Sequence, residues 1–96
     1  MKLSLLVLRK PQHWESLQAI EDDITQDNPA AAAAIGIRFI IDDQVSKLAD
    51  PNLPRRPGRV PGALELVAHP SYVVILEQTL DLVTVLEVLH TAMRYP

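Results

Sequence analysis

The sequence predicts an α+β domain in which a hairpin of two helices packs on one face of a small antiparallel sheet. Two segments in the first half of the chain repeat apolar residues every three or four positions, as helices do. A short alternating segment precedes them and three strand-length apolar segments follow, which gives the order β-α-α-β-β-β. The chain has 96 residues and no internal repeat, so we expect one domain over residues 1–96.

The first strand is expected over Lys2–Leu8, because Leu3, Leu5 and Val7 recur with the period of two that defines one face of a strand. The same segment has the lysine and the apolar block of a secretory signal peptide. That block is too short for a signal peptide and no small-residue cleavage site follows it, so we favour the strand.

The first helix is expected to begin at Pro11, which fits the first helical turn because its missing N–H would have no partner there. The residues of its apolar stripe recur at spacings of three and four, which predicts that they face the core. They are Trp14, Leu17, Ile20 and Ile24.

A second helix is expected after a short break, with Asn28 as its cap and Pro29 at its first position. It should end before Asp50-Pro51, and Gly36 in its middle is expected to permit close packing against the first helix. Its core-facing stripe consists of Ala34, Ile37, Ile41, Val45 and Leu48.

Three further apolar residues of the second helix, Ile35, Phe39 and Ile40, lie off its stripe. A helix that is apolar around more than half of its circumference must bury a second face. In one interpretation the helix lies between the sheet and the first helix, which covers these residues. In the other, this surface receives a partner chain.

The second half of the chain is expected to form the rest of the sheet. A connection over Asn52–Val60 has little regular structure in this prediction because it is rich in proline and arginine. The short Thr79–Asp81 turn predicts that the last two strands form an antiparallel hairpin. The strands are expected over Ala63–Ala68, Tyr72–Gln78 and Leu82–His90.

Composition and charge exclude several classes of function. The formal net charge of −3 excludes a strongly basic nucleic-acid binder, so no direct specific DNA binding is expected. Arg55, Arg56 and Arg59 nevertheless cluster, either as a solvated loop or as the contact site of an anionic partner. The chain has no cysteine, which fits a cytoplasmic protein, and its longest apolar run is far below the ~20 residues of a membrane span. Its three histidines are widely spaced, so neither a metal nor another cofactor is expected.

Candidate chemistry gathers at the strand ends. His69 precedes a proline and is expected to serve a turn. His90, Arg94 and Tyr95 end the chain, either as surface residues or as a group acting on an RNA phosphodiester by proton transfer and charge stabilisation. Glu65 has apolar neighbours, which indicates a solvent-facing position or an ion pair with Arg59 or Arg94.

Three sequence segments resemble the RelE/ParE toxin superfamily, and most closely its ParE-like, plasmid-stabilisation branch. They are DNPAAA, GRVPGALELVAHPSYVVIL and EVLHTAMRYP, within a match that covers roughly Pro11 to Pro96. The resemblance implies a toxin of a type II toxin–antitoxin module that a small antitoxin wraps and neutralises. ParE-like members poison DNA gyrase, whereas RelE-like members cut mRNA on the ribosome. The positions that match the family pattern are Arg59, Pro61, Gly62, Glu65, Leu66, Val67, His69, Pro70, Tyr72, His90 and Pro96.

The sequence departs from the family pattern where Leu64, Glu77 and Met93 replace residues that are usually basic, and Leu76 replaces a tyrosine. RNA cleavage is disfavoured by these departures, because phosphoryl transfer depends on cationic stabilisation. The leading hypothesis is therefore a gyrase-directed toxin that acts by protein–protein contact and is not an enzyme. The alternatives are a ribosome-dependent ribonuclease and a non-toxic homologue that still binds antitoxin.

The resemblance and the residue patterns together give two expected contact surfaces. The antitoxin is expected on the surplus apolar surface of the second helix, at Ile35, Phe39 and Ile40, and along the edges of the sheet. The expected target-binding residues are Arg59, Glu65, His90, Arg94 and Tyr95. If the protein were a ribonuclease, the last three of these would be its catalytic residues.

Overall fold

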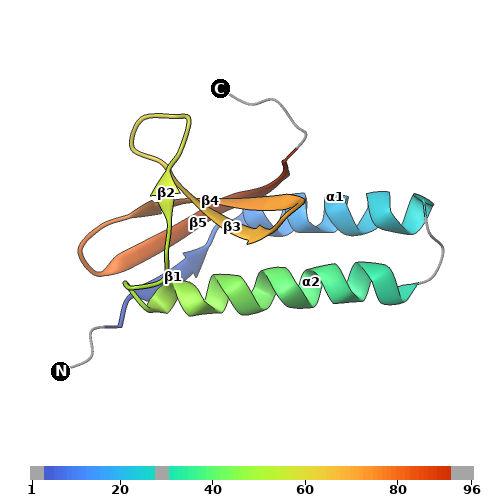
Figure 1. The fold of residues 1–96 in the computed structure, drawn as a ribbon, viewed down its shortest axis with the longest axis horizontal. Helices are drawn as coiled ribbons and strands as arrows, with labels where there is room; N and C mark the ends of the chain where they lie inside the picture. Colours follow the sequence, from blue (N-terminus) through green and yellow to red (C-terminus); the bar gives the residue numbers. More distant parts are fainter. Residues whose placement is uncertain (1–3, 28–30, 92–96) are drawn as a thin grey trace.

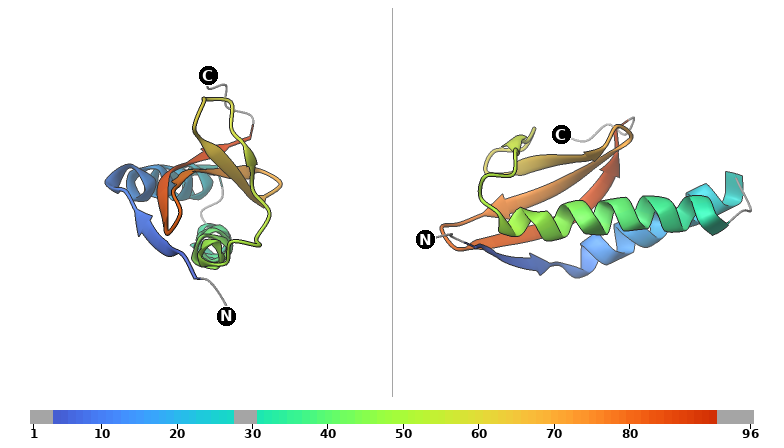
Figure 2. Two further views of the ribbon diagram at one scale, coloured as in Figure 1. Left: turned by 90° about the vertical axis from the view of Figure 1, so that its left-hand side faces the viewer. Right: turned by 60° about the horizontal axis from the view of Figure 1, so that its bottom comes forward.

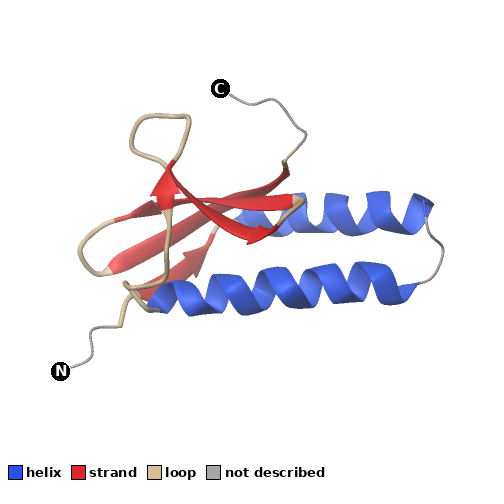
Figure 3. Cartoon of the chain, viewed as in Figure 1, coloured by secondary structure: helices blue, strands red, loops and turns tan. Residues whose placement is uncertain are grey.

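The structure, a computed structural model, describes residues 4–27 and 31–91. Two long helices lie side by side against a five-stranded sheet (Figure 1, Figure 3), which confirms the α+β class and the helical hairpin. The elements in chain order are β1 (Leu6–Arg9), α1 (Pro11–Asp27), α2 (Ala31–Ser46), the 3-10 turn η1 (Lys47–Ala49), β2 (Arg56–Pro57), β3 (Leu64–His69), β4 (Tyr72–Gln78) and β5 (Leu82–His90).

The sheet has the strand order β1-β5-β4-β3-β2 and is mostly antiparallel. The prediction of an antiparallel sheet is wrong for one pair, because β1 runs parallel to β5 with Leu6 opposite Leu82. The expectation of little regular structure before β3 also fails at Arg56 and Pro57, which form the short strand β2. The predicted bounds of β4 and β5 are confirmed, as is their tight turn, in which the Thr79 N–H bonds the Leu82 carbonyl.

Helix α1 begins at Pro11 as predicted, but its buried stripe starts one residue earlier than expected. His13 is fully buried together with Leu17 and Ile20, whereas the Trp14 ring is 42% exposed. The guanidinium carbon of Arg9 lies 5.0 Å from the Trp14 ring centroid, so a cation rather than the core covers part of this ring.

The predicted stripe of α2 is confirmed. Ile41, Val45 and Leu48 are fully buried, Ala34 is buried, and Ile37 is partly buried. Helical structure ends at Ala49, before Asp50-Pro51. The expected cap Asn28 and the expected first residue Pro29 lie outside the described residues.

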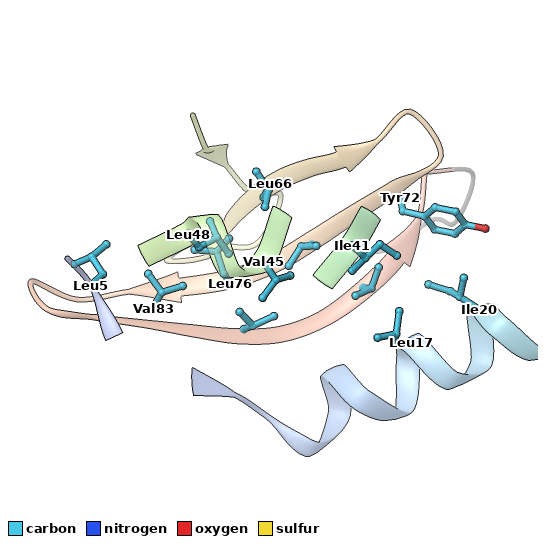
Figure 4. Packing of buried hydrophobic residues seen from close by; sticks show 13 residues of the cluster. Leu5, Leu17, Ile20, Ile41, Val45, Leu48, Leu66, Tyr72, Leu76 and Val83 are labelled. Carbon is cyan, nitrogen blue, oxygen red and sulfur yellow. The ribbon is translucent and has the colours of Figure 1, made fainter. Parts of the chain in front are cut away.

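One apolar core joins the two helices to the inner face of the sheet (Figure 4). Leu17 and Ile20 come from α1, and Ile41, Val45 and Leu48 come from α2 or η1. The sheet contributes side chains that alternate along its strands, as expected when one face is covered. These are Leu66, Tyr72, Val74, Leu76, Val83, Val85 and Val88.

Helix α1 also closes part of the edge of the sheet. Strand β1 pairs with β5 only as far as Val85, so beyond this point another group must satisfy the backbone of β5. The Val88 N–H donates to the Ser16 hydroxyl at 2.9 Å, and that hydroxyl donates to the His13 carbonyl at 2.8 Å. A helix side chain thus replaces a strand at this position.

Replacing Ser16 with alanine is expected to lower the free energy of unfolding by about 1–3 kcal/mol, because it leaves a buried N–H without its acceptor. Val88 is only 2% exposed, so water cannot readily replace the hydroxyl. Urea unfolding measures the change, and Ser46→Ala serves as the control because its hydroxyl bonds the Asp43 carbonyl on an exposed turn. Equal stability of the two variants would contradict this role for Ser16.

Gly36 lies on an exposed part of α2, and a methyl group added there would meet no atom within 4 Å. The expectation that this glycine permits close helix packing is therefore wrong. Gly36→Ala should instead raise the free energy of unfolding by about 0.5–1 kcal/mol, since alanine loses less backbone entropy in a helix. Thermal unfolding followed by circular dichroism tests this increase, and an unchanged or lower melting temperature would refute it.

Candidate functional site

The face of the sheet that points away from the core is the outer face. Strand alternation places Glu65, Val73 and Ile75 on this face, because their neighbours Leu66, Val74 and Leu76 belong to the core. The loop between β2 and β3 stands on the side of the sheet away from α2 (Figure 2). This loop and the outer face together form the first candidate surface.

The loop that carries Arg59 depends on two glycines. Gly62 has a φ of 85°, a left-handed conformation that glycine adopts without strain. At Gly58 a Cβ atom would lie 3.0 Å from the Ala63 carbonyl oxygen, the same oxygen that accepts a bond from the Gly58 N–H at 2.8 Å. The Pro/Gly-rich sequence therefore holds Arg59 on a closed loop beside the outer face.

Three of the predicted target-binding residues, Arg59, Glu65 and His90, line one small hollow with a volume of about 50 Å³. Glu65 belongs to the outer face, whereas His90 pairs with the core residue Tyr72 and its ring lies against the Tyr72 ring. The structure thus brings together residues far apart in the sequence. Arg94 and Tyr95, the other two, lie outside the described residues. The remaining lining residues are Arg56, Val73, Leu89 and Thr91.

Glu65 is only 5% exposed, so the prediction of a solvent-facing position is wrong. It forms an ion pair with Arg56, whereas the expected partners were Arg59 or Arg94. The Arg56 Nε atom donates to Glu65 Oε1 at 2.9 Å, directly across the pair of strands β2 and β3. The sequence did not indicate Arg56 as a partner, because a two-residue strand containing proline has no periodic pattern.

Arg55 has a structural role in the connection before β2. It donates hydrogen bonds to the carbonyls of Leu53 and Asp50 and to the Gln78 side chain, at 2.7–3.0 Å. Burial lowers the pKa of Arg55, and Asp50 opposes this shift. For Arg55, the interpretation of the basic cluster as part of a loop therefore fits the contacts better than the interpretation as a contact site.

His69, Tyr72 and His90 form an aromatic group at one end of the sheet. His69 Nδ1 accepts the Ser71 N–H at 3.0 Å, which confirms its expected role in the turn. The Tyr72 ring centroid lies 5.8 Å from that of His69 and 5.3 Å from that of His90. Burial raises the pKa of Tyr72, and Asp23 adds to the increase, so its phenol stays neutral at physiological pH.

The departures from the family pattern differ in where they lie. Leu64 packs against the core and Leu76 is fully buried within it, so neither changes the outer face. Position 64 therefore lies on the core side of β3. Glu77 is exposed and lies on the outer face, whereas Met93 lies outside the described residues.

The apolar helix face, defined as Ile35, Phe39 and Ile40, is the second candidate surface. Its side chains are 67%, 73% and 38% exposed, so the interpretation that the sheet and α1 cover them is wrong. A shallow groove of about 260 Å³ between α1 and α2 adjoins Ile35. The edge strand β1 also exposes apolar side chains, with Leu6 71% and Leu8 50% exposed.

Ion pairs join α2 to α1 and to β1 beside this surface. Arg38 pairs with Glu21 at 2.9 Å, and Arg9 pairs with Asp42 at 2.7 Å. His13 is fully buried, and neither of its ring nitrogens has a hydrogen-bond partner among the described residues. Burial, followed by the nearby charge of Arg9, lowers the pKa of His13 to about 4.

Within residues 4–27 and 31–91, no group of three histidine, cysteine or acidic side chains lies close enough to hold a metal ion. None of the described helices is long and apolar enough to cross a membrane.

The family model described as the ParE toxin of the type II toxin-antitoxin system parDE matches residues 7–95. No curated protein matches the sequence.

Two solved structures are similar to the chain in fold. A chain of the chromosomal ParDE TA system from P. aeruginosa has a TM-score of 0.79 and 19% sequence identity, covering 91% of this chain and 96% of that chain. A chain of the toxin-antitoxin complex RelBE2 from Mycobacterium tuberculosis has a TM-score of 0.57 and 17% identity, covering 95% of both chains. At such identities, these likenesses show the fold alone.

Proposed function

We propose, from the premise that this chain belongs to the ParE toxin family of type II toxin–antitoxin systems, that it is neutralised by a cognate antitoxin and acts on DNA gyrase by protein–protein contact. The observation that carries the proposal is the gathering of Arg59, Glu65 and His90 around one hollow. Their hollow of about 50 Å³ is far smaller than the roughly 300–1,000 Å³ of small-molecule pockets, which favours protein contact over nucleotide binding. Because gyrase acts on chromosomal DNA, the proposed site of action is the cytoplasm.

Supercoiling by purified gyrase tests the target. The protein should inhibit the reaction, and Arg59→Ala and His90→Ala should each weaken inhibition at least tenfold, because each removes a polar group from the proposed contact. Lys47→Ala is the matched control, since Lys47 is an exposed cation on η1 that pairs with Asp43. Circular dichroism of all variants separates loss of contact from loss of fold.

Each other outcome of this test rejects the gyrase proposal in a specific way. Normal supercoiling at saturating protein would exclude gyrase as the target. Cleavage of ribosome-bound mRNA that disappears in His90→Ala would support the ribonuclease alternative instead. Induced expression without growth arrest would support the non-toxic homologue that only binds antitoxin.

We place the antitoxin on the apolar helix face. Exposed apolar side chains that are contiguous on a helix are typical of protein interaction sites. Phe39 is 73% exposed and points away from the core stripe, so it offers a large apolar side chain for a partner to bury. An amphipathic segment of the antitoxin could bind here by covering Phe39 together with Ile35 and Ile40.

Phe39→Asp is expected to weaken the complex with the cognate antitoxin at least tenfold, about 1.4 kcal/mol or more, because it puts a charge into the apolar contact. Isothermal calorimetry measures the affinity. Leu80→Asp is the matched control: Leu80 is 97% exposed in the β4–β5 turn, so the same charge is added away from the helix face. Equal affinities of the two variants would show that the antitoxin binds elsewhere.

A further inference from the structure

A second hollow lies on the outer face, with a volume of about 250 Å³. It is formed by β4 and β5, by the loop that precedes β3 and by the first turn of α1. Its walls are mainly apolar, and Glu77 and Glu87 are its two charged lining residues, so we refer to it as the Glu77 hollow. The complete lining is Gln12, Val60, Pro61, Ala63, Ile75, Glu77, Leu86 and Glu87.

An irregularity in the strand pairing shapes this hollow. Ile75 pairs with Glu87 and the next residue, Leu76, pairs with Val85, so Leu86 is an extra residue in β5. Such a bulge bends the strand and changes the direction of its side chains. Both Leu86 and Glu87 consequently line the hollow, next to the buried side chain of Ile75.

The two carboxylates differ in how they are held. The Gln12 amide Nε2 donates a hydrogen bond to Glu87 Oε2 at 2.5 Å, which fixes Glu87 in place. Glu77 is exposed, and within the described residues no lysine, arginine or histidine forms an ion pair with it. The hollow therefore combines apolar walls with negative charge that the described part of the chain does not neutralise.

We propose that the Glu77 hollow receives a cationic side chain, arginine or lysine, of the polypeptide that docks on the outer face. Its volume is below the range of about 300–1,000 Å³ typical of small-molecule pockets and suits one long side chain. Apolar walls formed by Ile75 and Leu86 suit the methylene stem of such a side chain, while the carboxylates suit its charged end.

The position of the hollow adds specificity to this contact. In the sheet register Glu65 is opposite Ile75, and Ile75 is opposite Glu87. One row of residues therefore connects the small hollow that Arg59, Glu65 and His90 line with the Glu77 hollow. One hollow is therefore lined by Arg56 and Arg59 together with Glu65, and the other by the carboxylates of Glu77 and Glu87. Charges of both signs at fixed positions select the orientation of a partner.

A titration followed by two-dimensional NMR tests the hollow directly, with N-acetyl-arginine-N-methylamide as the probe. The neutral isostere N-acetyl-citrulline-N-methylamide is the control, because it differs from the probe in charge and hardly in shape. The arginine probe should cause saturable shifts, in the millimolar range, at the backbone amides of Ile75, Glu77 and Glu87. The citrulline probe should shift these amides at least several-fold less at the same concentration.

Three variants sharpen the test. Glu77→Gln and Glu87→Gln should each weaken arginine binding several-fold, because each removes one negative charge while preserving side-chain size. Asp27→Asn removes a charge at the far end of α1 and should leave binding unchanged. Equal shifts with both probes, shifts that do not saturate, or unchanged binding in Glu77→Gln would each overturn the proposal.

The inference rests on the proposed function only in assuming that a protein docks on the outer face. A protein that binds the arginine probe as expected but leaves gyrase fully active would refute the gyrase target and keep the cation site. A protein that inhibits gyrase equally well as wild type and as Glu77→Gln, and does not bind the probe, would refute the cation site alone.

Discussion

Lowering the pH from 7 to 4 is expected to reduce the free energy of unfolding by about 3 kcal/mol through His13 alone. In the folded protein the pKa of His13 is lowered from 6.5 to about 4. Between these two values the unfolded chain binds a proton that the folded protein does not bind, so stability falls as the pH decreases. Above pH 6.5 the imidazole is neutral in both states and this penalty is absent.

The surroundings of His13 explain why it resists protonation. It is fully buried, and the charges of Arg9 in β1 and Arg38 in α2 both disfavour a positive charge on its imidazole ring. Asp42 acts in the opposite direction, but its carboxylate is already paired with Arg9 at 2.7 Å. Burial is the largest of these effects, and the described residues offer no hydrogen bond to either ring nitrogen.

The variant His13→Leu provides the control, because leucine cannot titrate and is of similar size. Urea unfolding of both proteins at a series of pH values gives the free energy of unfolding of each. Subtracting one from the other removes the contribution of the carboxylates, because these titrate in both proteins. The wild-type protein should lose about 3 kcal/mol more than the variant between pH 7 and 4. Parallel stability profiles would contradict the lowered pKa.

The fold could be predicted from the sequence where the spacing of apolar residues indicates which side chains are buried. The spacing of Ile41, Val45 and Leu48 identified the buried face of α2, and strand-length segments identified β4 and β5. Strand neighbours could not be predicted in this way. An alternating segment indicates which residues share a face, but it does not indicate that β1 lies parallel to β5.

The predicted stripe of α1 is confirmed at Leu17, Ile20 and Ile24, and its first position was assigned to Trp14 instead of His13 for a physical reason. A histidine is usually assigned to the polar side of a helix and a tryptophan to its apolar side. Here His13 is buried, while Trp14 lies under the guanidinium groups of Arg9 and Arg38, 5.0 and 5.8 Å from its ring centroid. Contacts from β1 and α2 decide this exchange, and they are not visible in the sequence of α1 itself.

The candidate site was predicted in part. Family resemblance pointed to Arg59, Glu65 and His90, and the structure places all three around one hollow. The partner Arg56 was not predicted as such, because its contact with Glu65 depends on the register of two short strands. Likewise, the neighbourhood of Glu77 depends on a bulge in β5, which no local sequence pattern revealed.

The two surfaces place different demands on the same scaffold. The exposed charges of the outer face, such as Glu77, can be exchanged with little effect on the core. Helix α2, in contrast, has a buried stripe and an exposed apolar face on one element. Substitutions on its two faces should therefore separate stability from partner binding.

Ile41→Ala is expected to lower the free energy of unfolding by about 2–5 kcal/mol, because Ile41 is fully buried between α2 and the sheet and its truncation leaves a cavity. For a domain of this size, each kcal/mol corresponds to roughly 4–8 °C in melting temperature. Phe39→Ala, two residues away on the same helix, removes a side chain that is 73% exposed and should change stability by only about 0.5 kcal/mol.

Thermal unfolding and antitoxin affinity measured on both variants complete the comparison. Ile41→Ala should melt at a much lower temperature and, below that temperature, bind antitoxin nearly as well as wild type. Phe39→Ala should melt like wild type and bind antitoxin more weakly. A large loss of stability in Phe39→Ala would show that its side chain packs within the fold, and the apolar helix face would then have no surplus surface for a partner to cover.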